Sequence, residues 1–196
     1  MSERLVLASA SPRRAELLGG LGLMFEIRPA DIDESVHLGE TGPSYVKRLA
    51  HEKALAVASH DELIIAADTT VDLDGELLGK PETADEAFSM LQRLSGNTHH
   101  VHTGVCVHRV FGAEHLIRST VVTTAVTFTQ LPDHWIEWYV GTGQPMDKAG
   151  GYGMQGSATL FVASIVGSPS NVIGLPLATV ARLVEEVGTD LFAFSH

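Results

Sequence analysis

Two long strand-like stretches in succession restrict most strongly what this chain can fold into. They run from Thr98 to Val110 and from about Leu116 to Thr129, and Val101, Val105 and Val107 share one face of the first. Such alternation with a period of two is typical of β-strands. Because helix-like segments precede and follow both stretches, we expect an α/β fold with a mixed, strongly twisted sheet and flanking helices.

The composition predicts one folded domain over residues 1–196 and argues against some partners. Hydrophobic residues make up 44% of the 196 residues, which is enough to form a core. Thirteen Lys and Arg against 24 Asp and Glu give a formal charge of −11, which argues against a nucleic-acid partner. Any phosphate site must therefore be a local basic cluster that works against this charge.

The single cysteine and the lengths of the apolar runs bear on location. Cys106 alone cannot form an intrachain disulfide, and its alternating neighbours predict a buried thiol. The apolar run Leu5 to Ala8 is too short for a signal peptide, and no stretch is long enough to span a membrane. We therefore expect a cytoplasmic protein with no membrane partner.

The first candidate site joins a predicted buried strand, Leu5 to Ala8, to a predicted helix. Ser11 followed by Pro12 is typical of an N-cap and a first helical position. Free backbone N–H groups at a helix start favour an anion, and hydroxyl and guanidinium groups beside them add donors. The side chains concerned are Ser9, Arg13 and Arg14. An ordinary N-cap followed by two solvated arginines fits the spacing equally well.

Lys53 has an unusual place on a predicted amphipathic helix, Ser44 to Ser59. On a helical wheel it falls within the apolar stripe, between Leu49 and Val57, although the polar face was open to it. A lysine there either extends past the core to solvent or enters a cleft to meet an anion. The position gives weight to the second alternative and leaves the first open.

Asp68 follows five apolar residues, Leu63 to Ala67, and we predict that this buried strand ends at the aspartate. Burying a carboxylate without a partner costs several kcal/mol, so Asp68 needs a metal, a base role or an ion pair. A turn aspartate that caps its own backbone is the alternative. The position at a strand end favours the functional role.

Further segments give weaker signals. Lys80 lies between a glycine and a proline after the hairpin signal Asp74-Gly75, and it faces either a phosphate or solvent. The glycine-rich stretch 147–156 carries Gln155 and either admits a ligand or forms a surface loop. His100 and His102 share a strand face, but packed or solvated histidines are more common than a zinc site without Cys or Glu neighbours.

Taken together, the segments resemble the Maf family of nucleoside triphosphate pyrophosphatases, which was first associated with inhibition of septum formation. The resemblance is carried, in chain order, by LASASPRR, RLAHEKA, AADTTV, GKP, LSGNTHHVHTGV, DKAGGYGMQG and NVIGLP. It implies two lobes around a cleft, similar to inosine triphosphate pyrophosphatases. It also implies hydrolysis of a nucleoside triphosphate between the α and β phosphates, a divalent cation (Mg²⁺ or Mn²⁺), and often a homodimer.

The resemblance also implies roles for individual residues. Asp68, Lys53 and Lys80 match catalytic positions; Glu34 and Asp68 match the metal site; Ser9, Arg13, Arg14, Thr69 and Gln155 match substrate-binding positions. Arg13, Thr69 and Gln155 look like the branch that acts on dTTP and UTP. The segment 167–170 lacks an aromatic residue that many members carry. A preference for 7-methyl-GTP or another purine, and a non-catalytic regulator of cell division, are the alternatives.

Overall fold

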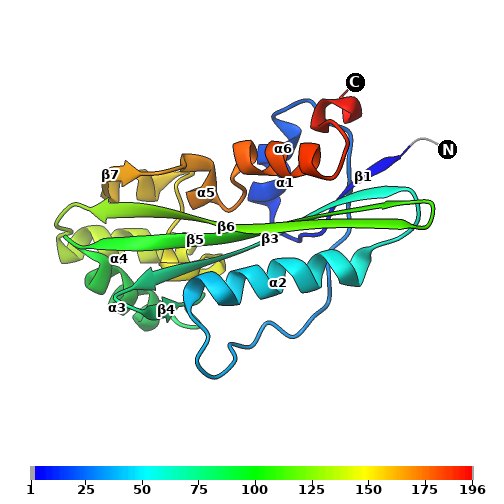
Figure 1. Cartoon of the computed structure of the whole chain (residues 1–196). Coiled ribbons are helices and arrows are strands. Elements are labelled where there is room, and N and C mark those ends of the chain that lie inside the picture. The colour runs from blue at the N-terminus through cyan, green and yellow to red at the C-terminus, as the bar shows by residue number, and fades with distance from the viewer. Residues whose placement is uncertain (1–2, 196) are drawn as a thin grey trace. The chain divides into compact units, whose positions relative to one another are not determined.

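A mixed sheet with helices beside it forms the framework of this protein, as its computed structural model shows for residues 3–195 (Figure 1). Its strands are β1 (Arg4–Leu7), β2 (Glu26–Ile27), β3 (Glu62–Leu73), β4 (Glu76–Leu78), β5 (Thr98–Phe111), β6 (Glu114–Phe128) and β7 (Val162–Val166). They follow the order β2-β1-β3-β5-β6-β7, and β4 pairs with β3. Strand β1 is parallel to β2 and β3, whereas β4 and β7 are antiparallel to their partners. The predicted mixed α/β fold is confirmed.

The helices fall largely where the sequence predicted them. They are α1 (Pro12–Gly19), α2 (Gly42–Val57), α3 (Ala84–Leu94), α4 (Asp133–Gly141), α5 (Pro169–Ile173) and α6 (Leu177–Glu186). Short 3-10 turns are η1 (Gln144–Asp147), η2 (Ala149–Gly151), η3 (Ser157–Phe161) and η4 (Leu191–Phe194). No helix within residues 3–195 combines the length and apolarity that crossing a membrane requires.

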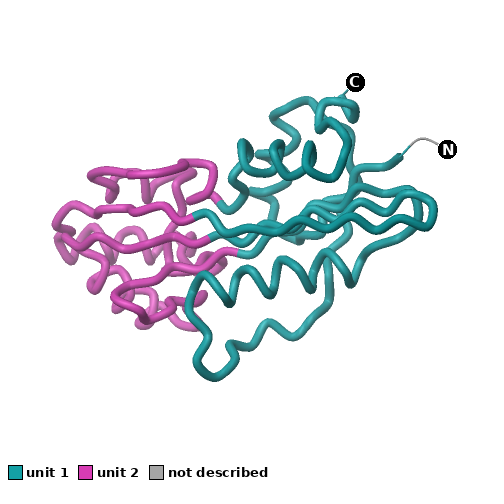
Figure 2. The backbone as a smooth tube through the Cα atoms, in the orientation of Figure 1, with its two compact units in different colours: residues 1–68, 103–122, 174–196 teal, residues 69–102, 123–173 magenta. Residues whose placement is uncertain are grey.

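The described chain divides into two compact units (Figure 2). Unit 1 contains residues 3–68, 103–122 and 174–195, and unit 2 contains residues 69–102 and 123–173. Strands β3, β5 and β6 each contribute residues to both units. A single domain over the whole chain stays a prediction.

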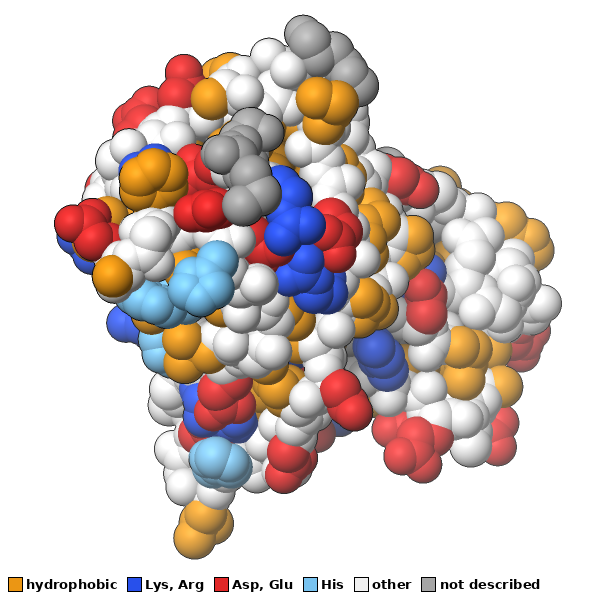
Figure 3. Space-filling model, turned by 90° about the vertical axis from the view of Figure 1, so that its right-hand side faces the viewer, with side chains coloured by type: hydrophobic (Ala, Val, Ile, Leu, Met, Phe, Trp, Pro, Cys, Tyr) orange, Lys and Arg blue, Asp and Glu red, His pale blue; other side chains and the backbone are white. Residues whose placement is uncertain are grey.

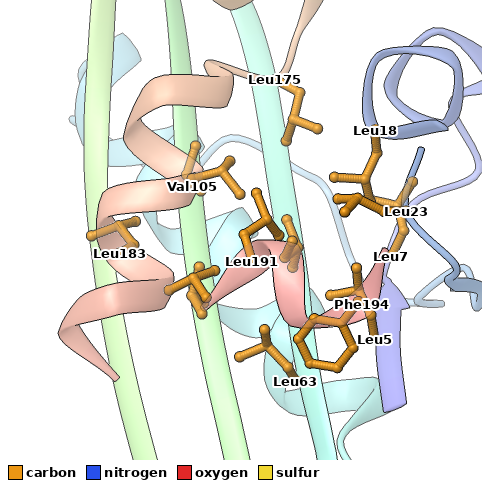
Figure 4. Packing of buried hydrophobic residues seen from close by; sticks show 14 of the residues in the cluster. Leu5, Leu7, Leu18, Leu23, Leu63, Val105, Leu175, Leu183, Leu191 and Phe194 are labelled. Carbon is orange, nitrogen blue, oxygen red and sulfur yellow. The ribbon is translucent and has the colours of Figure 1, made fainter. Parts of the chain in front are cut away.

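In unit 1, alternation along β3 directs its side chains to two different helix layers. Leu63 and Ile65 pack with α1 and α6, whereas Ile64 and Ala66 pack with α2. Figure 4 shows the first of these layers, where Leu63 of β3 and Val105 of β5 belong to one cluster with Leu183 of α6. The helices lie on opposite faces of the sheet in this unit (Figure 1). The next residue in the second series is Asp68, so its side chain faces α2.

Helix α2 lies unusually close to strand β5. A Cβ atom added to Gly104 would stand 2.0 Å from the carbonyl O of Val46, closer than real atoms approach. Glycine at this position therefore permits the contact between the helix backbone and the strand. Thr41 begins the helix in a capping box with Ser44, and the helix starts earlier than the sequence predicted.

One sequence prediction about elements was wrong. Strand β3 does not end at Asp68 but continues to Leu73, because its antiparallel pairing with β4 extends it. Ser11 occupies the N-cap position of α1 and Pro12 begins the helix, as predicted, although the Ser11 side chain makes no capping hydrogen bond. The short elements β2 and α5 were not predicted, since two to five residues carry no clear periodicity.

In unit 2, a second core forms around aromatic residues. Phe128 packs against Tyr152 with ring centroids 4.7 Å apart, and Tyr139 packs against Phe161 at 5.2 Å. The hairpin predicted at Asp74-Gly75 is present, with both residues at positive φ between β3 and β4. Cys106, in unit 1, is buried as predicted, and burial raises the pKa of its thiol to about 12.

Charged side chains on the surface are interleaved. Figure 3 shows Lys and Arg side chains next to Asp and Glu side chains on the face that it presents. In unit 1 the buried carboxylate of Glu62 accepts hydrogen bonds from Arg4 at 2.5 Å and from Arg28 at 2.8 Å. Arg109 likewise donates to Glu3 at 2.7 Å.

Candidate active site

Asp68 and Lys53 form a buried ion pair in unit 1. The Nζ of Lys53 donates to Oδ1 of Asp68 at 2.7 Å, and the two side chains are only 9% and 11% exposed. The contact arises because Asp68 faces the α2 layer and Lys53 faces the sheet. Of the alternatives left open, the structure therefore has Lys53 meeting an anion and Asp68 in an ion pair. It is not a turn aspartate, since it lies within β3.

Helix α2 holds the ammonium of Lys53 beneath an apolar surface. Val46, Leu49, Ala50 and Ala54 on the same stripe are fully buried, so the lysine side chain leaves the helix inside the packed layer. Glu34 supplies a second carboxylate, whose Oε1 lies 2.6 Å from Nζ. Because Glu34 is 52% exposed, the cluster is open to solvent on that side.

Strand β1 is short, and the segment that follows it lies beside Asp68 of the neighbouring strand β3. Leu7 is in register with Ile65, and the N–H of Ala8 donates to the carbonyl O of Ile65 at 2.9 Å. The chain then turns away through Ser9 into α1, and Ser9 is buried. Strand β1 is parallel to β3 and ends at Leu7, before β3 reaches Asp68. The start of α1 therefore lies beyond the end of β1, next to Asp68.

Ser9 and Arg14 are tied to each other at this point. Arg14 Nη1 donates to Oγ of Ser9 at 3.1 Å, and its Nε donates to the carbonyl O of Gly174 at 2.8 Å. Burial lowers the pKa of Arg14 below its usual value, while the charge of Asp68 opposes this shift. The charges of Arg13 and Glu34 also act on Arg14, so these groups share one electrostatic environment. The structure thus brings together the predicted site residues of unit 1.

The remaining predicted residues lie in unit 2. Thr69 directly follows Asp68 in β3, and Lys80 and Gln155 are exposed. The N–H of Gly150 donates to the carbonyl O of Gly79 at 3.0 Å, which joins the turn of Lys80 to the glycine-rich stretch. The segment 167–170 includes the first residues of α5.

The carboxylates of Asp68 and Glu34 are suited to a hard divalent cation. Both direct an oxygen to the same point, and Mg²⁺ in proteins is commonly held by one or two carboxylates together with substrate phosphates. Within residues 3–195, no cluster of three or more His, Cys, Asp or Glu side chains has an arrangement that holds a metal ion. His102 instead contacts Thr123 at 2.8 Å in a packed strand.

Sequence reasoning missed two residues of α2 that contact the segment of Glu34. Tyr45 donates to the carbonyl O of Glu34 at 2.8 Å, and Arg48 donates to the carbonyl O of Ser35 at 2.9 Å. Arg48 lies on the helix face that the pattern assigned to solvent, and the pattern gave Tyr45 no role. An open pocket of about 400 Å³ borders this face and is lined by Ser44, Lys47, Arg48, His51 and Ser119, none of them a predicted site residue.

Comparison with known proteins identifies the family. The sequence matches the family of Maf-like proteins over residues 4–187, nearly the whole chain. The chain belongs to the Maf family. A relative from Anaeromyxobacter dehalogenans (strain 2CP-C), named dTTP/UTP pyrophosphatase, is 54% identical over 97% of both chains. One with the same name from Myxococcus xanthus (strain DK1622) is 51% identical, over 95% of this chain and 94% of that protein.

A solved structure supports the fold of this Maf-family chain. A HAM1 protein from Coxiella burnetii matches with a TM-score of 0.50 and 16% sequence identity, over 95% of this chain and 100% of that protein. At this identity the likeness concerns the fold alone. The likeness supports the mixed α/β fold of the chain.

Proposed function

We propose that this Maf-family chain hydrolyses dTTP and UTP to the nucleoside monophosphate and pyrophosphate. The names of its relatives support the reaction and the pyrimidine substrates, at 51–54% identity over nearly the full length. The observation that carries the proposal is the ammonium of Lys53, buried between the carboxylates of Asp68 and Glu34. A buried charge cluster that is open to solvent on one side can meet a charged substrate, and this supports a catalytic site.

Asp68 is assigned the role of general base. Lys53 binds its Oδ1 and fixes the orientation of the carboxylate. The other oxygen, Oδ2, is assigned to take a proton from water as that water attacks the α-phosphorus. The bond from the α-phosphorus to the bridging oxygen breaks, and pyrophosphate leaves with its electron pair.

We assign several cationic side chains the role of stabilising the negative charge that grows on the leaving pyrophosphate. Arg13 and Arg14 offer guanidinium donors at the start of α1, and the resemblance adds Lys80. Lys53 contributes a charge that the surrounding apolar layer keeps from being screened. These groups stabilise the transition state more than the bound substrate, because the leaving group gains charge as the bond breaks.

A divalent cation, Mg²⁺ or Mn²⁺, completes the proposal. When bound, such an ion withdraws charge from the phosphate oxygens and lowers the barrier to attack. Glu34 and Asp68 would hold it, beside the ammonium of Lys53. Thr69 and Gln155 are assigned to the base, since each has donors and acceptors that match a pyrimidine edge. A cytoplasmic location and a homodimer stay predictions.

A pyrophosphate-release screen tests this function. Wild-type protein is assayed with dTTP, UTP, CTP, dATP, GTP and 7-methyl-GTP, with Mg²⁺, with Mn²⁺ and with a chelator. We expect release from dTTP and UTP with kcat/KM at least about 10-fold above the other nucleotides, and none with the chelator. A preference for 7-methyl-GTP would overturn the pyrimidine assignment. Tight nucleotide binding without product would instead indicate a non-catalytic regulator.

A further inference from the structure

Glu34 reaches Lys53 from a segment that has no regular structure of its own. Residues 28–41, between β2 and α2, contain no helix or strand, and Glu34 is largely exposed. A carboxylate on such a segment loses backbone and side-chain freedom when it is held in one place. Its position at 2.6 Å from the lysine ammonium therefore requires restraints elsewhere in the segment.

Two side chains of α2 restrain consecutive carbonyl groups of this segment. The hydroxyl of Tyr45 donates to the carbonyl O of Glu34 at 2.8 Å, and Nη2 of Arg48 donates to the carbonyl O of Ser35 at 2.9 Å. The guanidinium of Arg48 also lies over the ring of Tyr45, with Cζ 5.7 Å from the ring centroid. The backbone is thus held at the residue that carries the carboxylate.

Arg48 also closes the segment through Glu40. Its Nε and Nη2 donate to the two carboxylate oxygens of Glu40 at 2.6 and 2.9 Å, a two-bond pairing that fixes geometry as well as charge. Oε2 of Glu40 in turn accepts from the N–H of His37 at 2.8 Å. The hydrogen bond from Arg48 lowers the pKa of Glu40 to about 2, so this contact persists at any physiological pH.

We infer that Tyr45 and Arg48 are positioning residues that hold Glu34 against Lys53, and so set how tightly the site takes a divalent cation. One helix carries Lys53 and both restraints, so a single element aligns the carboxylate of Glu34 with the ammonium. The kinetic consequence rests on the proposed function. The restraint on the segment is independent of the proposed function.

Two variants and one matched control separate this role from general stability. Tyr45→Phe removes a single hydroxyl, and Arg48→Met removes the guanidinium while it keeps an unbranched side chain. Arg93→Met is the control, because Arg93 forms a similar two-bond pair with Glu76, at 2.9 and 2.5 Å, in unit 2. Arg93 is not among the predicted site residues.

Amide hydrogen exchange, followed by NMR on nucleotide-free protein, tests the restraint directly. The amide of His37 should exchange at least about 10-fold faster in Arg48→Met than in wild type, because its acceptor Glu40 is released. Arg93→Met should match wild type at this amide. Equal exchange in Arg48→Met and wild type would overturn the inference, whether or not the protein hydrolyses nucleotides.

Kinetics test the consequence for Glu34. Both variants should raise the Mg²⁺ concentration that gives half-maximal pyrophosphate release by about 10-fold, with kcat at saturating Mg²⁺ within about 2-fold. In a Glu34→Gln background the same substitutions should raise this Mg²⁺ concentration by less than about 2-fold further, because the carboxylate that they position is absent. Full additivity, or a loss of kcat alone, would overturn the inference. Absence of release by wild type would overturn the proposed function, and the exchange result would still decide the restraint.

Discussion

At the scale of single residues, the ion pair of Lys53 and Asp68 is the most consequential contact in unit 1. Both side chains are almost fully buried, so each would be costly without the other. Glu34 compensates the lysine only in part, from the solvent side. The pair is therefore sensitive to the loss of one partner and more tolerant of the loss of both.

A double-mutant cycle measures this dependence. Lys53→Met should lower the free energy of unfolding by about 3 kcal/mol, because it leaves the carboxylate of Asp68 buried and unpaired. Lys53→Met combined with Asp68→Asn should cost less than the sum of the single changes by about 1–3 kcal/mol. Urea unfolding measures all three variants. Lys47→Met, at an exposed position of the same helix, should change stability by less than about 0.5 kcal/mol. Additive costs would contradict the pairing.

At the scale of elements, the contact of α2 with β5 determines where Lys53 lies. Gly104 allows the helix backbone at Val46 to meet the strand, and Ala50 and Ala54 keep the next turns close. Larger residues at any of these positions would separate the helix from the sheet. The distance between Lys53 and Asp68 therefore depends on a glycine in a different element.

Gly104→Ala tests that dependence. The added methyl would clash with backbone atoms that cannot rotate away, so the free energy of unfolding should fall by about 3 kcal/mol. Gly141→Ala is a matched control, because a Cβ there meets nothing within 4 Å. The control should change stability by less than about 1 kcal/mol. Chemical denaturation compares the two, and equal stabilities would show that α2 and β5 are not so closely packed.

A buried histidine on β5 makes the stability of unit 2 dependent on pH. Nε2 of His99 lies 2.6 Å from the hydroxyl of Tyr152, and burial lowers the pKa of His99 from 6.5 to about 4. As the pH falls, His99 takes up a proton in the unfolded chain before it does so in the folded protein. Its contribution to the free energy of unfolding is therefore full above about pH 6.5 and is lost as the pH falls toward 4.

The size of this pH dependence follows from the lowered pKa of His99. Between pH 6.5 and pH 4 His99 should remove about 3 kcal/mol of unfolding free energy. His99→Gln, which keeps a polar group near Tyr152, should show a correspondingly weaker dependence on pH over this range. Thermal unfolding at a series of pH values measures both proteins. Parallel curves for the variant and wild type would contradict the assignment to His99.

At the scale of the whole molecule, the sequence predicts the elements better than their partners. Alternation and helical periodicity located β5, β6 and α2, and the ordered motifs predicted which residues of unit 1 share one site. The length of β3 was missed, because Asp68-Thr69-Thr70 has the polarity of a strand end and only pairing with β4 extends it. Tyr45 and Arg48 were missed because they hold the segment of Glu34 partly through backbone carbonyls, and that segment has no periodicity to place it beside α2.

The formal charge of −11 determines what the chain needs in order to bind a negatively charged substrate. A net negative protein that acts on a polyanion needs its cations concentrated at one place, and Arg13, Arg14 and Lys53 provide this in unit 1. Asp68 is the carboxylate among them. The proposed hydrolysis therefore depends most strongly on the carboxylate of Asp68.

The kinetics of Asp68→Asn test this claim most directly. Pyrophosphate release from dTTP is measured with saturating Mg²⁺ for wild type, Asp68→Asn and the exposed control Asp85→Asn. Circular dichroism first confirms that each variant is folded. The account predicts that kcat of Asp68→Asn falls by about 100-fold or more, and that Asp85→Asn matches wild type. A folded Asp68→Asn protein with the kcat of wild type would contradict it.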